Sequence, residues 1–288
     1  MSNRVKAIIG GLATIAVWAT AFPFSKIVLQ HVDPLTLAVA RVVGGAILML
    51  IIGVAKGLQI PTSWREWGLY IILGMTGNFV YQVVFNQGLL TIPAATSSII
   101  MALTPMTTAL MALVVYKDFM RPIGWLFTIT AFAGVAIIIL WKGPINVPMG
   151  AFWTLFGMIL FAIYNIVNRG LSLKGHDSIT VATWSMFTGA IMALPFVSQS
   201  VATIAAAPPI AWLAIIYLAC FSSALGFVFW SYAFEHAEKV TDVTNFMYIS
   251  PIVAAVVAAF LLGEYPNMGL YIGAPIILGS LYLFNRYR

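Results

Sequence analysis

The residue types best suited to ligand chemistry in this sequence are amides and aromatic rings that share one helical face. Asn78, Tyr81, Gln82 and Phe85 are spaced i, i+3, i+4 and i+7 within the apolar segment 66–89. Residues at that spacing lie on one side of an α-helix. A side-chain amide has two donors and two acceptor lone pairs, and polar groups inside a helix bundle are costly unless they meet a partner or a wet cavity. We therefore interpret this face as part of a binding pocket.

Similar groups recur on other apolar segments. The further candidate substrate-binding residues are Ser97 and Met101 on 94–116, in one stripe with Thr104 and Thr108; Tyr164, Asn165 and Asn168 on 149–169; Phe227 and Trp230 on 210–234; and Asn245 and Tyr248 on 240–262. The alternative is helix–helix packing, in which hydroxyls bond their own backbone and asparagines join neighbouring helices. For the hydroxyl-rich stripe the two interpretations stand equal, whereas large amides beside aromatic rings favour a binding role.

Amides, hydroxyls and helix ends can hold a zwitterionic amino acid without a fixed charge. They supply donors for the carboxylate and acceptors for the ammonium group. An aromatic substrate can stack on tyrosine, phenylalanine or tryptophan, and an organic cation can lie on the face of the same rings. The pocket chemistry therefore suits amino acids and organic cations and does not separate them.

Few ionisable side chains lie inside the apolar segments. Segment 6–29 contains no carboxylate, which argues against strong proton coupling through a membrane acid. Arg41 is the one charge that lies well inside a segment, away from its ends. Either its guanidinium reaches the outer interface, which we favour, or it attracts substrate carboxylates at the outer mouth. One cysteine and three scattered histidines form no metal-spaced cluster, and no nucleotide loop or hydrolytic triad is present. We expect no metal, no cofactor and no enzyme.

The elements that must position these residues are membrane-spanning helices. Of 288 residues, 62% are hydrophobic and 8% are charged, against about 25% charged in soluble chains, so lipid is the implied solvent. Runs of about 20 apolar residues can cross a bilayer as helices. We predict an all-α membrane protein with ten transmembrane helices, at 6–29, 34–55, 66–89, 94–116, 121–141, 149–169, 178–197, 210–234, 240–262 and 267–285.

The sequence repeats its own pattern at a shift of about 145 residues, so that Pro105 falls on Pro251. Five helices in each copy make the second copy enter the membrane from the opposite side, which is the inverted-repeat plan of secondary transporters. We predict two inverted five-helix repeats, 1–146 and 147–288, with the substrate between them. The paired prolines are expected to be hinges for alternating access, the alternative being inherited kinks.

The basic residues indicate how the chain sits in the membrane. The net charge of +6 does not indicate nucleic-acid binding, because lysines and arginines stand in short loops beside apolar segments. Most lie on the side of the N-terminus, whereas the other side carries only Lys26 and Lys142. Cytoplasmic loops are the positively charged ones. We therefore expect a multi-pass inner-membrane protein with both termini in the cytoplasm.

Four motifs resemble the drug/metabolite transporter (DMT) superfamily, in its ten-span EamA type. They are Trp18-Ala19-Thr20-Ala21-Phe22, Asp33-Pro34, the stretch from Ala94-Ala95 to Thr104-Pro105, and Leu262-Gly263-Glu264. The resemblance covers nearly the whole chain. The overall sequence is similar to YddG-type exporters, which implies export of aromatic and other neutral amino acids and of paraquat. The motifs themselves are specific to the superfamily and name no substrate.

We therefore predict an inner-membrane secondary transporter that exports amino acids, aromatic and other neutral ones, and related small metabolites by alternating access. One alternative is a multidrug or organic-cation exporter, which a deep acidic residue would have supported. The other is a passive channel or a membrane scaffold. The predicted partners are a small-molecule substrate and the lipid bilayer, and the sequence leaves the oligomeric state, the preferred amino acid and the driving force open.

Overall fold

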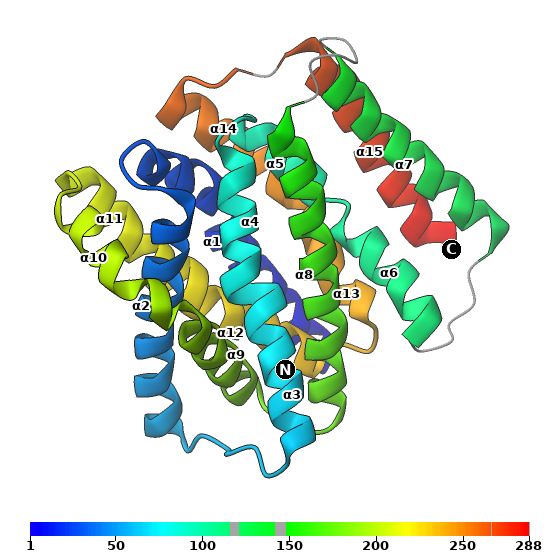
Figure 1. The fold of residues 1–288 in the computed structure, drawn as a ribbon. Helices are drawn as coiled ribbons and strands as arrows, with labels where there is room; N and C mark the ends of the chain where they lie inside the picture. The colour runs from blue at the N-terminus through cyan, green and yellow to red at the C-terminus, as the bar shows by residue number, and fades with distance from the viewer. Residues whose placement is uncertain (116–120, 142–147, 266, 288) are drawn as a thin grey trace.

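The chain folds into helices, with no strand, over the residues that this computed structural model describes, namely 1–115, 121–141, 148–265 and 267–287 (Figure 1). In chain order the helical elements are α1 (Asn3–Leu29), α2 (Pro34–Lys56), α3 (Trp64–Leu73), η1 (Gly74–Asn78), α4 (Phe79–Leu89), α5 (Ala94–Met101), α6 (Thr104–Val115), α7 (Pro122–Leu140), α8 (Met149–Leu173), α9 (Ser178–Ala193), η3 (Leu194–Phe196), α10 (Val197–Ala205), α11 (Pro209–Tyr217), η4 (Leu218–Leu225), α12 (Gly226–His236), α13 (Val240–Thr244), η5 (Asn245–Ile249), α14 (Ser250–Leu262) and α15 (Met268–Tyr287).

Eight helical segments are long and apolar enough to cross a membrane. They are Asn3–Leu29, Pro34–Lys56, Trp64–Leu89, Ala94–Val115, Met149–Leu173, Ser178–Ala205, Pro209–His236 and Val240–Leu262. Two shorter apolar helices, Pro122–Ile138 and Met268–Phe284, accompany them. The all-helical prediction is confirmed, whereas ten full spans in two repeats remain a prediction. The predicted boundary between the repeats, at 146 and 147, falls in 142–147, outside the described residues together with Lys142.

Two aspartates begin α2 and α9 in the same way. Asp33 accepts hydrogen bonds from the backbone N–H of Leu35 and of Thr36, both at 3.0 Å, and from Thr36 Oγ1 at 2.6 Å. Asp177 accepts from the backbone N–H and the Oγ1 of Thr180, at 2.9 and 2.6 Å. Such caps satisfy N–H groups that have no partner within the helix. Partial burial raises the pKa of Asp33, but the hydrogen bonds from Thr36 and Leu35 outweigh it and hold that pKa below its ordinary value.

Five of the spanning segments are interrupted: η3 separates α9 from α10 in Ser178–Ala205, and the other four interruptions form two pairs. The π-helical turns η1 and η4 separate α3 from α4 and α11 from α12. A break at Ala102–Leu103 separates α5 from α6, and the 3₁₀ segment η5 separates α13 from α14. The sequence predicted each of these four segments as a single transmembrane helix, with a hinge or kink expected at Pro105 and Pro251 but no π-helical turn in the other two.

Proline explains the second pair of interruptions. Pro105 has no N–H to donate to the carbonyl of Met101 four residues earlier, and Thr104 Oγ1 donates to that carbonyl instead, at 2.6 Å. Pro251 likewise stands in the first turn of α14, directly after η5. The break between α5 and α6 therefore divides the predicted stripe of Ser97, Met101, Thr104 and Thr108. The predicted face of Asn245 and Tyr248 lies in η5 rather than in an α-helix.

A glycine of the opposite sequence half packs against each π-helical turn. A Cβ added at Gly189 of α9 would lie 2.9 Å from the Cβ of Asn78 in η1. A Cβ added at Gly45 of α2 would lie 3.2 Å from the Cβ of Ser223 in η4. Both approaches are closer than ordinary side-chain packing, so α9 meets η1 and α2 meets η4 nearly backbone to backbone.

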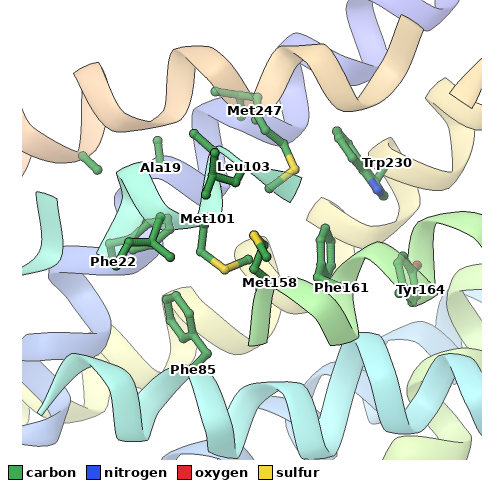
Figure 2. Packing of buried hydrophobic residues seen from close by; sticks show 14 of the residues in the cluster. Ala19, Phe22, Phe85, Met101, Leu103, Met158, Phe161, Tyr164, Trp230 and Met247 are labelled. Atoms are coloured by element: carbon green, nitrogen blue, oxygen red, sulfur yellow. The ribbon is translucent and has the colours of Figure 1, made fainter. Parts of the chain in front are cut away.

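The helices form one main bundle with a pair at its edge. α7 and α15 pack against each other at the upper right of Figure 1, and the other long helices surround a common apolar core. Tyr164, Phe161 and Trp230 are among its largest fully buried side chains. Figure 2 shows the thioethers of Met101 and Met158 between these rings and Phe85. The core therefore places polarisable, flexible side chains at the centre of the bundle.

Candidate functional site

A small cavity lies at the centre of the bundle, where helices from both predicted halves meet. Its volume of about 40 Å³ holds a few water molecules, at roughly 10–15 Å³ each. Rings and thioethers make up much of the wall, from Trp18, Phe22, Tyr81, Phe85, Met101, Phe161, Phe227 and Met247. The polar groups in the wall belong to Arg41, Gln82, Ser98, Ser222 and Ser250. In this conformation an organic solute enters only if side chains or helices move.

Trp18 holds the aromatic part of the wall together. Its ring centroid lies 5.3 Å from that of Phe161, 5.2 Å from Phe227 and 5.1 Å from Trp230, in the edge-on or tilted contacts that aromatic pairs favour. Its Nε1 donates to the backbone carbonyl of Ser222 at 2.8 Å. One indole from α1 therefore packs against rings of α8 and α12 and is bonded to η4.

Arg41 lies inside the bundle and forms part of the cavity wall. Only 3% of its surface is exposed. Its guanidinium donates to the hydroxyls of Ser25 and Ser222, both at 3.1 Å, and of Ser223 at 3.3 Å. The favoured prediction, that Arg41 reaches the outer interface, is wrong because hydroxyls from α1 and η4 hold it within the bundle. Within the part of the chain that the structure describes, no carboxylate lies at ion-pair distance from it.

Five of the candidate substrate-binding residues line the cavity. They are Tyr81, Gln82, Phe85, Met101 and Phe227. Tyr81 and Phe85 stack with 5.8 Å between their ring centroids. Gln82 is 2% exposed, and its Oε1 has no hydrogen-bond partner among the described residues. The wall thus joins a stacked aromatic pair and a free amide oxygen on α4 to groups from α5 and α12.

Four other candidates form a network behind the aromatic wall. Asn165 donates to Thr108 Oγ1 at 3.3 Å and accepts from Trp230 Nε1 at 2.9 Å. Asn168 donates to the hydroxyl of Tyr164 at 2.9 Å. All of these side chains are buried. Their contacts join α8 to α6 and α12, which is the arrangement that the packing interpretation describes.

The remaining four candidates lie away from the cavity wall. Asn78 Nδ2 makes a long contact with the carbonyl of Leu73, at 3.4 Å. The hydroxyl of Ser97 lies 3.5 Å from that of Thr154. Asn245 lines a second cavity, and Tyr248 is partly exposed in η5. The structure therefore does not bring the thirteen candidates into one group.

Several residues of the wall were not selected from the sequence. They include Trp18, Phe22, Ser98, Phe161, Ser222, Met247 and Ser250. Trp18 and Phe22 are four residues apart, so the helical-face criterion used for 66–89 would have found them. Ser222 gave no such signal, because the π-helical turn η4 changes the register of the helix.

A wider, polar cavity of about 590 Å³ opens at the N-terminal end of α1. Arg4 contributes to its wall, together with the acidic residues Glu235, Glu238 and Asp242. Asn245 also lines it, and its Oδ1 is buried without a hydrogen-bond partner in the described chain. The bundle is therefore hollowed and polar at this end.

Glu264 closes the bundle at the opposite end of α1. It forms an ion pair with Lys26, and the backbone N–H of Ala94 donates to its other oxygen at 2.8 Å. Ala94 is the first residue of α5, where a carboxylate is favoured by the unpaired N–H groups of the helix. These contacts cross-link the ends of α1, α5 and α14.

Known proteins resemble this chain along its whole length. The model of the EamA-like transporter family matches residues 5–140 and 148–286. A protein of Streptantibioticus cattleyicolor named "Probable terminal-alkyne amino-acid exporter" is 29% identical over 281 residues, covering 98% of this chain and 94% of that protein. An "Uncharacterized transporter" of Archaeoglobus fulgidus is 29% identical over 279 residues, covering 94% of each. A solved structure described as "Crystal structure of protein" has a TM-score of 0.67 at 20% identity, covering 97% of this chain and 98% of that one, and so has the same fold.

Proposed function

Since this chain belongs to the EamA-like transporter family, we propose that it exports amino acids, aromatic and other neutral ones, together with related small metabolites. Membership makes it a multi-pass membrane transporter of the drug/metabolite type and not an enzyme. Its partners are accordingly a small-molecule substrate and the lipid bilayer. The proposal concerns which solute moves and by what cycle.

The central cavity is the observation that carries the proposal. Its wall combines residues of 1–146, such as Trp18 and Tyr81, with residues of 147–288, such as Phe161. Secondary transporters built from inverted repeats hold their substrate between the repeats near the middle of the membrane. Rings and thioethers suit an apolar amino-acid side chain, and the similar protein of Streptantibioticus cattleyicolor is named as an amino-acid exporter.

Two unequal ends support a cycle of alternating access. The N-terminal end of α1 borders the wide polar cavity, while its other end is closed by Lys26 and Glu264. In the proposed cycle the two ends open in turn, and the substrate is enclosed in between. Pro105 and Pro251 stand beside the breaks in two spanning segments and would be the hinges, since a helix lacking the proline N–H bends there at little cost.

Two inverted repeats, 1–146 and 147–288, are the proposed framework of this cycle. The paired π-helical turns, the paired breaks and the paired aspartate caps support it, since each pair has one member in each half. The basic residues support an inner-membrane location with cytoplasmic termini. Asn3→Cys and Tyr287→Cys, each in a Cys220→Ala background, test this. Both cysteines should resist an impermeant thiol reagent in intact cells, and labelling of either from outside would contradict the topology.

Counterflow in proteoliposomes tests the function. Vesicles loaded with an unlabelled amino acid should accumulate the labelled one in a saturable manner, and a panel of neutral amino acids will identify the preferred substrate. Protein-free vesicles are the control for leakage. If no amino acid gives counterflow but paraquat does, the protein is an organic-cation exporter. Flux without saturation or exchange would indicate a channel, and no flux of any solute would indicate a scaffold.

A further inference from the structure

We propose that the guanidinium of Arg41 binds the carboxylate of the transported amino acid inside the central cavity, with the amide of Gln82 accepting a hydrogen bond from its ammonium group. This inference rests on the proposed amino-acid export and specifies the part of the substrate that the protein recognises. It implies that solutes with the same side chain but without a carboxylate are poor ligands.

Arg41 has no counter-charge among the described residues. The side chain is 3% exposed, and its hydrogen-bond partners are the hydroxyls of Ser25, Ser222 and Ser223. Hydroxyl groups accept hydrogen bonds but carry no net charge, and a buried cation is costly unless an anion pairs with it. A guanidinium has five N–H donors, of which these contacts use three. The described chain thus leaves the charge of Arg41 without an opposite charge, and a substrate carboxylate supplies one.

Arg169 provides an internal comparison. Among the arginines that the structure describes, it is the other largely buried one, with 8% of its surface exposed. Its guanidinium donates to the backbone carbonyls of Phe234 and Glu238, at 2.8 and 2.7 Å. These carbonyls lie at and just after the C-terminal end of α12, where the helix dipole is negative. Arg169 therefore fastens one helix end and lies outside the cavity wall, whereas Arg41 is part of that wall.

A hydrogen-bond acceptor lies on the same wall as Arg41. Gln82 lines the cavity with Arg41, and its Oε1 is buried without a hydrogen-bond partner in the described chain. An unpaired buried acceptor costs about 1–3 kcal/mol of stability, which a ligand donor relieves. A zwitterion carries an anionic acceptor and a cationic donor two bonds apart at its α-carbon. A guanidinium and a free amide oxygen on one wall are the complementary pair.

Three hydrogen bonds hold the guanidinium of Arg41 in a fixed position. Ser222 and Ser223 are consecutive, yet both hydroxyls accept from the same guanidinium. They lie in the π-helical turn η4, and such turns are frequent at functional sites. Gly45 lets α2 approach this turn closely, so the backbone of α2 brings Arg41 to the serines. Arg41 is thereby oriented before a ligand arrives, which reduces the entropy lost on binding.

A comparison of matched ligands tests the inference. The probe is the amino acid with the largest counterflow in the panel, together with the amine that lacks its carboxylate, for example phenylalanine and phenethylamine. Affinities are measured with purified protein as ligand-induced rises in unfolding temperature. Wild type should bind the acid about 30-fold or more tightly than the amine, since an unpaired buried charge remains in the amine complex. In Arg41→Gln this ratio should fall towards one, and Arg41→Lys should keep part of it.

Arg169→Gln is the matched control. It removes a buried guanidinium outside the cavity, so it should lower the unfolding temperature but leave the acid-to-amine ratio unchanged. An unchanged ratio in folded Arg41→Gln would overturn the role of Arg41 while amino-acid export stands. If Arg41→Gln does not fold, the wild-type ratio decides, because equal affinity for acid and amine overturns the inference. Counterflow of no amino acid by wild type would instead refute the proposed function.

Discussion

Removing the Glu264 closure should shift the protein toward the state that is open at the Lys26 end of the bundle. Glu264 makes two contacts there, the ion pair with Lys26 and the hydrogen bond from the Ala94 N–H at 2.8 Å. The side chains of the pair are 21% and 20% exposed, so we assign the pair about 1 kcal/mol. The charged hydrogen bond contributes about 1.5 kcal/mol. Together they favour the closed state by about 2.5 kcal/mol, provided that both contacts break on opening.

These values predict a graded series of variants. Lys26→Met removes only the ion pair and should change the ratio of the two states about fivefold, since 1.4 kcal/mol corresponds to a factor of ten. Glu264→Ala removes both contacts and should change the ratio by roughly 60-fold on the same scale. Glu264→Gln keeps a neutral acceptor for the Ala94 N–H and should fall between them.

A cysteine in the cavity wall reports the shift. Ser98→Cys, in a Cys220→Ala background, keeps the shape of a residue that lines the cavity. Its labelling rate by an impermeant thiol reagent, applied from the Lys26 side of oriented proteoliposomes, should rise in the order given above. Glu66→Gln is the matched control, since Glu66 accepts from the Thr62 N–H at 2.8 Å on an exposed surface. Equal labelling rates in all variants would refute the reasoning that these contacts hold one facing state.

Three further predictions test other features. Pro105→Ala and Pro251→Ala should shift the labelling rate of the Ser98→Cys reporter in opposite directions, because each restores an N–H and stiffens one proposed hinge. A shift in the same direction would leave both prolines as inherited kinks. Gly77→Ala places a Cβ against the ring of Tyr164 and should destabilise the protein by about 1–3 kcal/mol. The measurement is a lower unfolding temperature, and an unchanged unfolding temperature would contradict this packing. Asp33 has a lowered pKa, so its capping contribution is present above about pH 4 and is lost as the pH falls below it. Asp33→Asn should keep the cap and remove this acid sensitivity, measured by thermal unfolding as the pH falls below about 4. Equal acid sensitivity in both proteins would assign it to other groups.

Apolar length and helix breakers locate the helices of this chain well, because both signals are local. The segment predicted at 34–55 is the helix Pro34–Lys56, which begins at the cap that Asp33 provides. The segment predicted at 178–197 begins at its cap too, but helix continues to Ala205 through η3 and α10. The π-helical turns are harder to predict from the sequence, because they coincide with contacts between distant segments. In each case the contacting helix comes from the other half of the chain: α9 approaches η1, and α2 approaches η4.

The candidate site is predictable where the helix is regular. Tyr81, Gln82 and Phe85 all lie in α4, and all three line the cavity as their spacing predicts. Asn78 belongs to the same expected face but lies in η1, where the extra residue per turn changes the register. Arg41 could not be assigned from the sequence, because a guanidinium can extend to an interface or be held inside, and only its serine neighbours decide between them.

The order of synthesis separates Arg41 from two of its serine partners. Ser222 and Ser223 follow it by 181 and 182 residues, which at about 5–20 residues per second is a delay of roughly 10 to 35 s. An arginine at a helix centre costs about 2.5–3.5 kcal/mol on insertion. Arg41 lies nearer one end of Pro34–Lys56 and costs less than that, and the strongly apolar remainder of α2 offsets this cost. Until the second half of the chain arrives, Ser25 is the one of the three serine partners of Arg41 that is present. The hydrogen bonds that Ser222 and Ser223 accept from Arg41 therefore help to drive assembly of the two halves. A chain truncated before η4 lacks both serines and keeps the charge of Arg41 within the membrane without them.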